Sequence, residues 1–97
     1  MRIDPGALGF EWGRGNIGKN KRRGVEDSES EEAFFDERKT PLRDTLHSLG
    51  EERFVLLGKT KEARLLFVVF TQRGMRIRII SARDVNRKER PLYEKAA

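Results

Sequence analysis

Apolar residues cluster most strongly in the second half of the chain. Residues 64–71, Arg-Leu-Leu-Phe-Val-Val-Phe-Thr, are apolar at positions that face both sides of a strand. This pattern predicts a central strand with both faces covered. Residues 75–82 follow the short segment 72–74, which contains Gly74, and predict the second strand of a hairpin.

That second strand alternates between apolar and basic residues. Successive side chains of a strand point to opposite faces of a sheet. One face is therefore expected to carry Met75, Ile77 and Ile79, and the other Arg76, Arg78 and Ile80. We predict that the first face packs on a core and that the second is largely cationic.

Weaker patterns predict three further strands. Residues 42–47 and 53–58 precede the hairpin, and residues 9–12 form a short strand with Phe10 and Trp12 on one face. Residues 13–24 are ambiguous, because their basic spacing suits a short helix while their glycines weaken one. A glycine at their end is a natural stop for such a helix.

Residues 28–39 predict a helix. Ser28 and Glu31 have the spacing of a capping box, and acidic residues fill the first turn, where the helix dipole favours them. The buried side is expected to consist of Ala33, Phe34 and Phe35, with Pro41 closing the helix.

A last helix is predicted to start at Asn86 and Glu89, and Pro91 is expected to kink or cut it. The order of elements predicts an α+β fold with an antiparallel sheet and helices mainly on one face. Residues 1–9 are expected to be a flexible lead-in to one domain, because Pro5 and its neighbouring glycines discourage regular structure.

Composition points to a polyanionic partner. The chain has 97 residues, of which 38% are charged, with a formal net charge of +5. Basic residues dominate 14–23 and 73–90, and acidic residues dominate 26–37, a segregation that suits a binding face. The alternative is a generally basic protein without a nucleic-acid partner.

The composition argues against disulfides, several kinds of metal site and a membrane location. The chain has no cysteine and one histidine, so disulfides, cysteine metal sites and a histidine zinc site are not expected. No segment resembles a signal peptide or is apolar enough to span a membrane, which predicts a cytoplasmic protein without membrane contact.

Several ordered blocks resemble the BrnT family of ribonuclease toxins from bacterial type II toxin–antitoxin pairs. They include GFEW, GNIGKN, RRGV, SEEAFF, GEERF, RLLFVVFT and RIRIISARDVNRKER, and they extend over residues 10–95. The resemblance implies a RelE-like domain that cleaves RNA without a metal or cofactor and inhibits translation. It also implies neutralisation by a BrnA-type antitoxin, with operator DNA bound only through that antitoxin.

Metal-independent cleavage of RNA needs cations for the charged phosphorane, and arginine suits this role. Arg64, Arg78 and Arg83 are the candidates, expected to converge on one phosphate from the start of one strand and from its neighbour. The alternative is that Arg64 and Arg83 only form ion pairs with nearby carboxylates, namely Glu52, Glu62 or Asp84.

Proton transfer and RNA binding have further candidates. Lys21 can carry a proton if neighbouring cations lower its pKa, and His47, Glu52 and Glu11 are other possibilities. RNA binding is assigned to Arg22, Arg23, Arg76 and Trp12. Their alternatives are a solvated basic run, ordinary strand surface and, for the indole, a place in the core.

One difference from the family leaves a second function open. Members usually carry Lys-His-Gly where this chain has Arg22-Arg23-Gly24, so the family histidine is replaced by arginine. The alternative function is a catalytically weakened member that acts as an RNA- or antitoxin-binding module.

Overall fold

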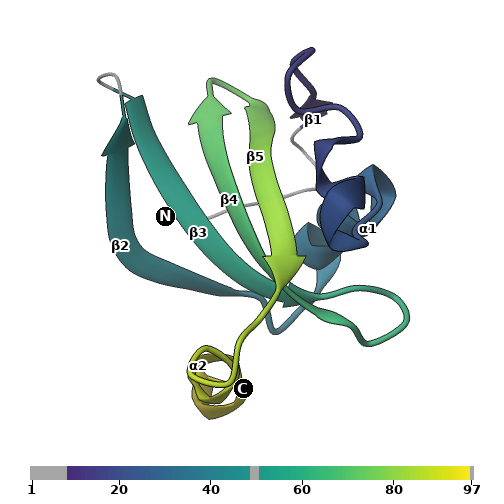
Figure 1. Ribbon diagram of the computed structural model, residues 1–97. Helices are drawn as coiled ribbons and strands as arrows, with labels where there is room; N and C mark the ends of the chain where they lie inside the picture. The colour runs from purple at the N-terminus through teal and green to yellow at the C-terminus, as the bar shows by residue number, and fades with distance from the viewer. Residues whose placement is uncertain (1–8, 49–50, 97) are drawn as a thin grey trace.

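The computed structural model describes residues 9–48 and 51–96, which form a five-stranded sheet with helices on both faces. The strands are β1 (Gly9–Glu11), β2 (Thr40–Ser48), β3 (Glu51–Lys59), β4 (Leu65–Arg73) and β5 (Arg76–Asp84). Their order in the sheet is β1-β5-β4-β3-β2, so β4 is central, as its apolar sequence predicts (Figure 1).

The sheet is mixed, which corrects the expectation of an antiparallel sheet. Strands β2 to β5 pair antiparallel with one another, but β1 pairs parallel with β5 and places Phe10 beside Ile77. The chain leaves β1 at one edge and enters β2 at the other edge. The helical segment between them therefore crosses one whole face of the sheet.

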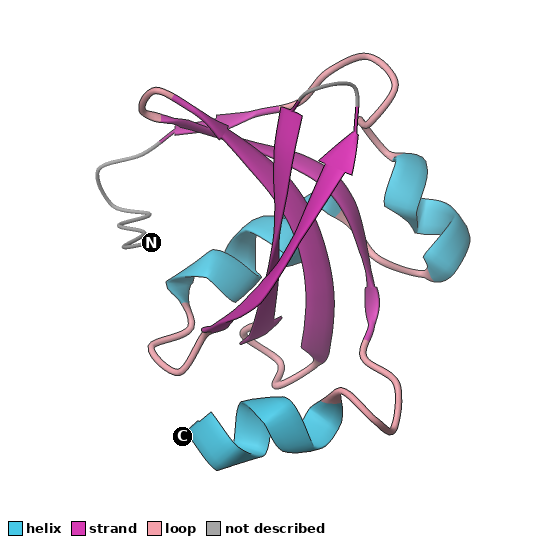
Figure 2. Ribbon diagram, turned by 90° about the vertical axis from the view of Figure 1, so that its left-hand side faces the viewer, coloured by secondary structure: helices cyan, strands magenta, loops and turns pink. Residues whose placement is uncertain are grey.

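That crossing segment contains the 3-10 helix η1 (Lys19–Arg23), helix α1 (Asp27–Glu32) and the 3-10 helix η2 (Ala33–Phe35). Helix α2 (Arg90–Ala96) packs at one end of the opposite face (Figure 2). None of the helices in the described part of the chain is long and apolar enough to cross a membrane.

The predicted helix of residues 28–39 is shorter than expected and starts earlier. Glu26 and Glu29, rather than Ser28 and Glu31, form the capping box. The helical segment ends at Asp36, whose extended backbone leads towards β2, and Pro41 lies inside that edge strand instead of closing the helix.

The main core lies between the crossing segment and the sheet. Phe34 is fully buried, and its ring meets Phe10 and Phe70 edge to face at centroid distances of 5.3 and 5.0 Å. Phe35, expected in the same core, is 58% exposed, because its position in the short η2 turns it away from the sheet.

The hairpin of β4 and β5 turns at Gly74 and Met75, later than the predicted segment 72–74. Gly74 has a φ of 58°, a conformation that favours glycine. Met75 is 68% exposed in this turn and does not join the core, contrary to its predicted alternation with Ile77.

A bulge at Ile80 changes the alternation of β5. Val69 pairs with Ser81 and Phe70 pairs with Ile79, so Ile80 is an extra residue without a partner in β4. From Arg76 to Ile79 the predicted faces are correct. Beyond the bulge the faces exchange, which puts Ala82 in the core and Arg83 on the face of Arg78.

Helix α2 is fixed by a tyrosine. Tyr93 packs with Leu57 and Leu65, and its hydroxyl donates a 2.6 Å hydrogen bond to Oδ2 of Asp36. Burial and this hydrogen bond raise the pKa of Tyr93 to about 12. Pro91 does not cut the helix, because it is the second residue of α2, where no intrahelical donor is needed.

We expect Gly58→Ala to destabilise the protein. A Cβ at Gly58 would overlap the backbone carbonyl of Ala33, so η2 would have to move away from the sheet. Overpacking of this kind costs about 1–3 kcal/mol in the free energy of unfolding, measurable by urea denaturation. Gly15→Ala is the matched control, since a Cβ there meets nothing within 4 Å. Equal stability of the two variants would contradict the close packing.

We expect the stability to depend on Tyr93 at alkaline pH. Because the pKa is raised from 10.0 to about 12 in the folded state, this contribution is complete below pH 10 and is lost as the pH rises through about 12. Tyr93→Phe should lower stability at neutral pH by about 1.5 kcal/mol and remove that pH dependence. Tyrosinate absorbance measures the pKa directly, because the chain has one tyrosine; an unshifted value would disprove the bond to Asp36.

Candidate functional site

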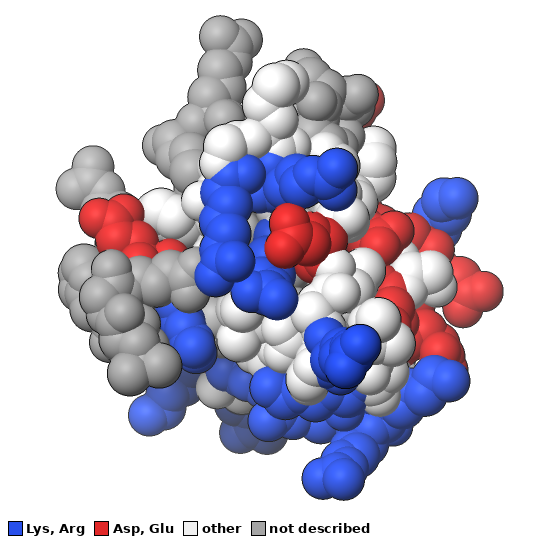
Figure 3. Space-filling view, turned by 90° about the horizontal axis from the view of Figure 1, so that it is seen from above, with Lys and Arg blue, Asp and Glu red and all other residues white. Residues whose placement is uncertain are grey.

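Arginines gather on the sheet face opposite α1. We call this the arginine face and define it by Arg53 of β3, Arg73 of β4, and Arg76, Arg78 and Arg83 of β5. In the register of the sheet, Arg78 lies beside Thr71, Arg76 beside Arg73, and Arg83 beside Phe67. Seen from the end where the β4–β5 turn lies, basic side chains cover the middle and lower margin of the molecule (Figure 3).

Arg83 lies at the α2 end of this face and is held by a carboxylate. Its two Nη atoms donate to Glu89 at 2.9 and 2.7 Å, and its guanidinium lies 4.0 Å from the ring centroid of Phe67. The hydrogen bonds to Glu89 raise the pKa of Arg83 and lower that of Glu89. One edge of the guanidinium is therefore already occupied by a carboxylate of this chain.

Arg64 lies on the other face of the sheet. Its Nε and Nη2 donate to Asp84 at 2.7 and 2.9 Å, which raises the pKa of Arg64 and lowers that of Asp84. Its Nη1 donates to the carbonyl of Gly24 and approaches Glu29 at 3.3 Å. Arg64 thus ties α1 to the sheet, and the structure does not bring it together with Arg78 and Arg83.

Arg78 is half-buried in the middle of the arginine face. Parallel pairing places it beside Glu11 at the end of β1. A Cβ at Gly13 would overlap its guanidinium, so the chain after β1 passes directly against this side chain. No ion pair with Arg78 is formed among residues 9–48 and 51–96.

The basic run of η1 lies along the outer edge of β5. Asn20 is buried, and its Oδ1 accepts a 3.0 Å hydrogen bond from the backbone N–H of Ala82. This part of β5 lies past the residues that pair with β1. Arg22 and Arg23 are exposed, and Lys21 is exposed with its Nζ 3.8 Å from Glu26. These cations stand at the edge of the sheet rather than in the middle of the arginine face.

Two other predicted site residues, Trp12 and Glu52, lie away from the middle of the arginine face. A third, His47, has a side chain that is not among the described residues. Trp12 packs on the main core, and its Nε1 donates to Glu31 at 2.7 Å. Glu52 is exposed and next to Arg53 in sequence, which points it to the opposite face. His47 is opposite Glu52 in β2, and its side chain lies outside the described residues.

The sequence analysis missed Arg53 and Thr71, which lie level with Arg78 on the two neighbouring strands. Phe54 pairs with Phe70, so Arg53 and Thr71 are neighbours across β3 and β4. Strand alternation over residues 53–58 contains the signal, since Arg53 shares its parity with the buried Val55 and Leu57. The pairing of the strands was needed to show that the row exists.

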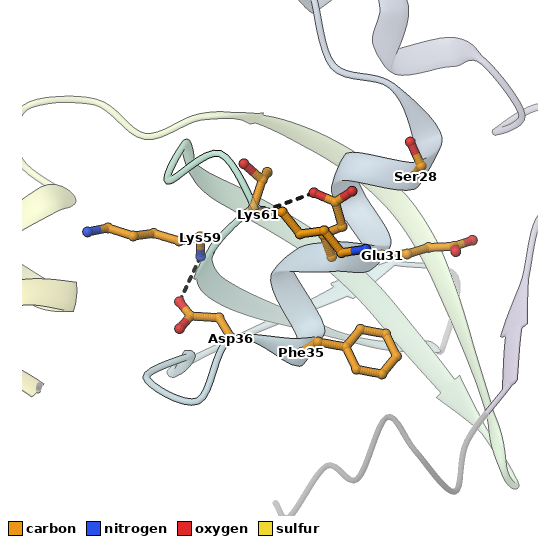
Figure 4. Close-up of a pocket in the computed structure, with 8 residues that line it drawn as sticks. Ser28, Glu31, Phe35, Asp36, Lys59 and Lys61 are labelled. Atoms are coloured by element: carbon orange, nitrogen blue, oxygen red, sulfur yellow. Dashed lines mark hydrogen bonds between the residues drawn. The ribbon is translucent and has the colours of Figure 1, made fainter.

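A hollow of about 680 Å³ lies between α1 and the loop from β3 to β4, away from the arginine face (Figure 4). Its carboxylates are already engaged. Glu32 accepts from the N–H of Lys61, Asp36 from the N–H of Lys59, and Glu31 from the indole of Trp12. No group of residues in 9–48 and 51–96 has an arrangement of carboxylates and imidazoles that could hold a metal ion.

Comparison with known families gives one match that covers most of the chain. Residues 12–89 match the family described as "ribonuclease toxin, BrnT, of type II toxin-antitoxin system". No curated protein matches the chain. The matched region includes β2 to β5, the crossing segment and every arginine of the arginine face.

We expect Arg64 and Asp84 to be coupled in stability. A double-mutant cycle with Arg64→Met and Asp84→Asn should give a coupling energy of about 0.2–1 kcal/mol, because the pair is bidentate but partly exposed. Urea denaturation of the four proteins gives the value. A coupling of zero would show that the pair of Arg64 with Asp84 does not contribute to stability.

Proposed function

This chain belongs to the BrnT family of ribonuclease toxins of type II toxin–antitoxin systems, and on that premise we propose that it is a metal-independent endoribonuclease whose cleavage of RNA inhibits translation. The toxin domain we assign to residues 10–95, with a RelE-like fold. The observation that carries the proposal is the arginine face, where Arg78 of β5 lies between Thr71 of β4 and Glu11 of β1.

The proposed reaction uses the 2′-hydroxyl of the RNA as the nucleophile. Its oxygen attacks the adjacent phosphorus, the bond to the 5′ oxygen breaks, and a 2′,3′-cyclic phosphate forms. Arg78 stabilises the charge that develops on the phosphate oxygens, and Arg76 binds a neighbouring phosphate. Glu11 accepts the proton of the 2′-hydroxyl, because it is the carboxylate paired with Arg78 in the sheet.

The other basic candidates have supporting roles in this proposal. Arg83 contributes positive charge at the α2 end of the face while Glu89 fixes its orientation. Lys21 of η1 is the proposed donor of the proton to the leaving 5′ oxygen, and Arg22 and Arg23 beside it contact the RNA backbone at the edge of β5. Arg64 keeps α1 on the sheet and does not contact the substrate.

Membership in a type II family implies a protein antitoxin as partner. We propose that this partner is a BrnA-type antitoxin, which neutralises the toxin and carries the contact with operator DNA. The described part of the chain offers no long helix for a major groove, since α1 and α2 are both short.

A second candidate function is a member with weakened chemistry that binds RNA or the antitoxin. One feature of the sequence favours it: the resemblance implies Lys-His-Gly where this chain has Arg22-Arg23-Gly24, and His47 is the one histidine in the chain. In this reading the arginine face binds RNA, and no group accepts the proton of the 2′-hydroxyl.

Cleavage assays distinguish the two functions. We expect the purified chain to cut RNA in EDTA and to leave 2′,3′-cyclic phosphate ends. Arg78→Ala should reduce kcat by about 10²–10³-fold because it removes charge stabilisation, and Glu11→Gln by about 10²–10⁴-fold because it removes the base. Arg87→Ala is the control, an exposed arginine outside the proposed site.

RNA binding by the same variants completes the experiment. Glu11→Gln should bind RNA as well as the unchanged chain, since it removes a negative charge from the face. If the chain binds RNA but never cuts it, the second function is correct. If cleavage survives in Glu11→Gln at the rate of the unchanged chain, Glu11 is not the base.

A further inference from the structure

Three buried polar atoms on the arginine face have no hydrogen-bond partner. They are Nε of Arg53, Oγ1 of Thr71 and Nε of Arg78, within the part of the chain that the structure describes. The other such atom, Nδ2 of Asn20, belongs to η1 and is separate from them. Buried polar groups are nearly always bonded, so three unbonded ones in one place require an explanation.

The three side chains form one continuous row across the sheet. Thr71 of β4 pairs with Arg78 of β5, and Phe54 pairs with Phe70, which puts Arg53 of β3 on the other side of Thr71. The order across the row is therefore Arg53, Thr71, Arg78, with Glu11 at the β1 end. Because they share one face, these groups can all reach a single ligand lying on the sheet.

Without a ligand, the row lowers the stability of the protein. Thr71 is 1% exposed, and a valine would fill the same space without burying a hydroxyl that lacks a partner. Both arginines are half-buried, so each guanidinium reaches the surface while its Nε does not. An anion on the surface would supply acceptors that these donors lack in the free protein.

We propose that Arg53, Thr71 and Arg78 form a phosphate-binding row that holds the RNA backbone across β3, β4 and β5. On binding, each guanidinium turns so that its Nε and one Nη face the phosphate oxygens, the bidentate geometry that arginine prefers. The hydroxyl of Thr71 donates to the same phosphate between them.

RNA fits this row better than an isolated anion does. Arg76 lies in the next row of the same face, about 7 Å further along the strands, where it can meet a neighbouring phosphate. Glu11 at the end of the first row lies where it can accept a proton from a bound ribose. The three residues of the row would thus be phosphate contacts of the proposed ribonuclease. This inference rests on the proposed function.

Conservative variants test the row by binding instead of cleavage. The probe is a 2′-O-methylated oligoribonucleotide, which has the phosphates of RNA but cannot be cut through its 2′ oxygen. Thr71→Val removes only the hydroxyl, and Arg53→Lys keeps the charge but loses the planar fork. Each should weaken binding by at least about tenfold, the effect of one hydrogen bond to a charged group.

Thermal unfolding of the same variants separates a binding row from a structural one. Thr71→Val should keep or raise Tm, because it removes a buried hydroxyl without a partner. Arg87→Lys, a matched change at an exposed position outside the face, should leave both affinity and Tm unchanged. Weaker binding together with an unchanged or higher Tm supports the row.

Other results overturn one proposal without the other. If Thr71→Val and Arg53→Lys bind the oligonucleotide as tightly as the unchanged chain, the row is not a phosphate site, whatever the chain does to RNA. If they bind it weakly but the unchanged chain cuts no RNA, the row is correct and the proposed ribonuclease activity is wrong. Lower Tm with unchanged affinity assigns these residues a structural role and refutes the row.

Discussion

One extra residue in β5 decides which arginines share a face of the sheet. In a regular strand, Arg78 and Arg83 would point to opposite faces, because they are an odd number of residues apart. The bulge at Ile80 takes one residue out of the pairing with β4 and places both guanidinium groups on one side of the sheet. The same bulge returns Ala82 to the core, so the core remains continuous while the charged face is assembled.

Four arginines in or next to the sheet fall into two pairs, according to whether a carboxylate of the described residues binds them. Arg64 and Arg83 are each bonded to a carboxylate through two nitrogen atoms, Arg64 to Asp84 at the end of β5 and Arg83 to Glu89 just before α2. Arg53 and Arg78 have an Nε that bonds to nothing in the described chain. This division is the basis for proposing Arg53 and Arg78, rather than Arg64, as contacts for the substrate.

With the proposed phosphate site, stability and binding make opposite demands on the middle of the arginine face. A chain selected only for stability would bury an apolar residue at Thr71, because a hydroxyl without a partner lowers the free energy of unfolding. Proteins often retain such groups where a ligand completes their hydrogen bonds. The aromatic contacts of Phe34 with Phe10 and Phe70 stabilise the other face of the sheet.

The amino-acid pattern alone determined the parts of the fold that depend on local order. The apolar run of β4 identified the central strand, and Gly24, at a φ of 74°, ends η1 where a glycine stop was expected. The alternation of β5 predicted a cationic face correctly as far as Ile79, since the direction of a strand side chain depends only on its neighbours. The resemblance to BrnT toxins was also present in the sequence blocks, and the family match confirms it.

Tertiary structure decided the rest, because these features depend on residues far apart in the chain. The parallel pairing of β1 with β5 brings Glu11 to Arg78, although the two are separated by most of the sequence. The bulge depends on the register between β4 and β5, and the row of Arg53, Thr71 and Arg78 depends on the order of three strands. The bonds of Arg64 to Asp84 and Glu29 depend on the same long-range packing, which the composition of a segment does not contain.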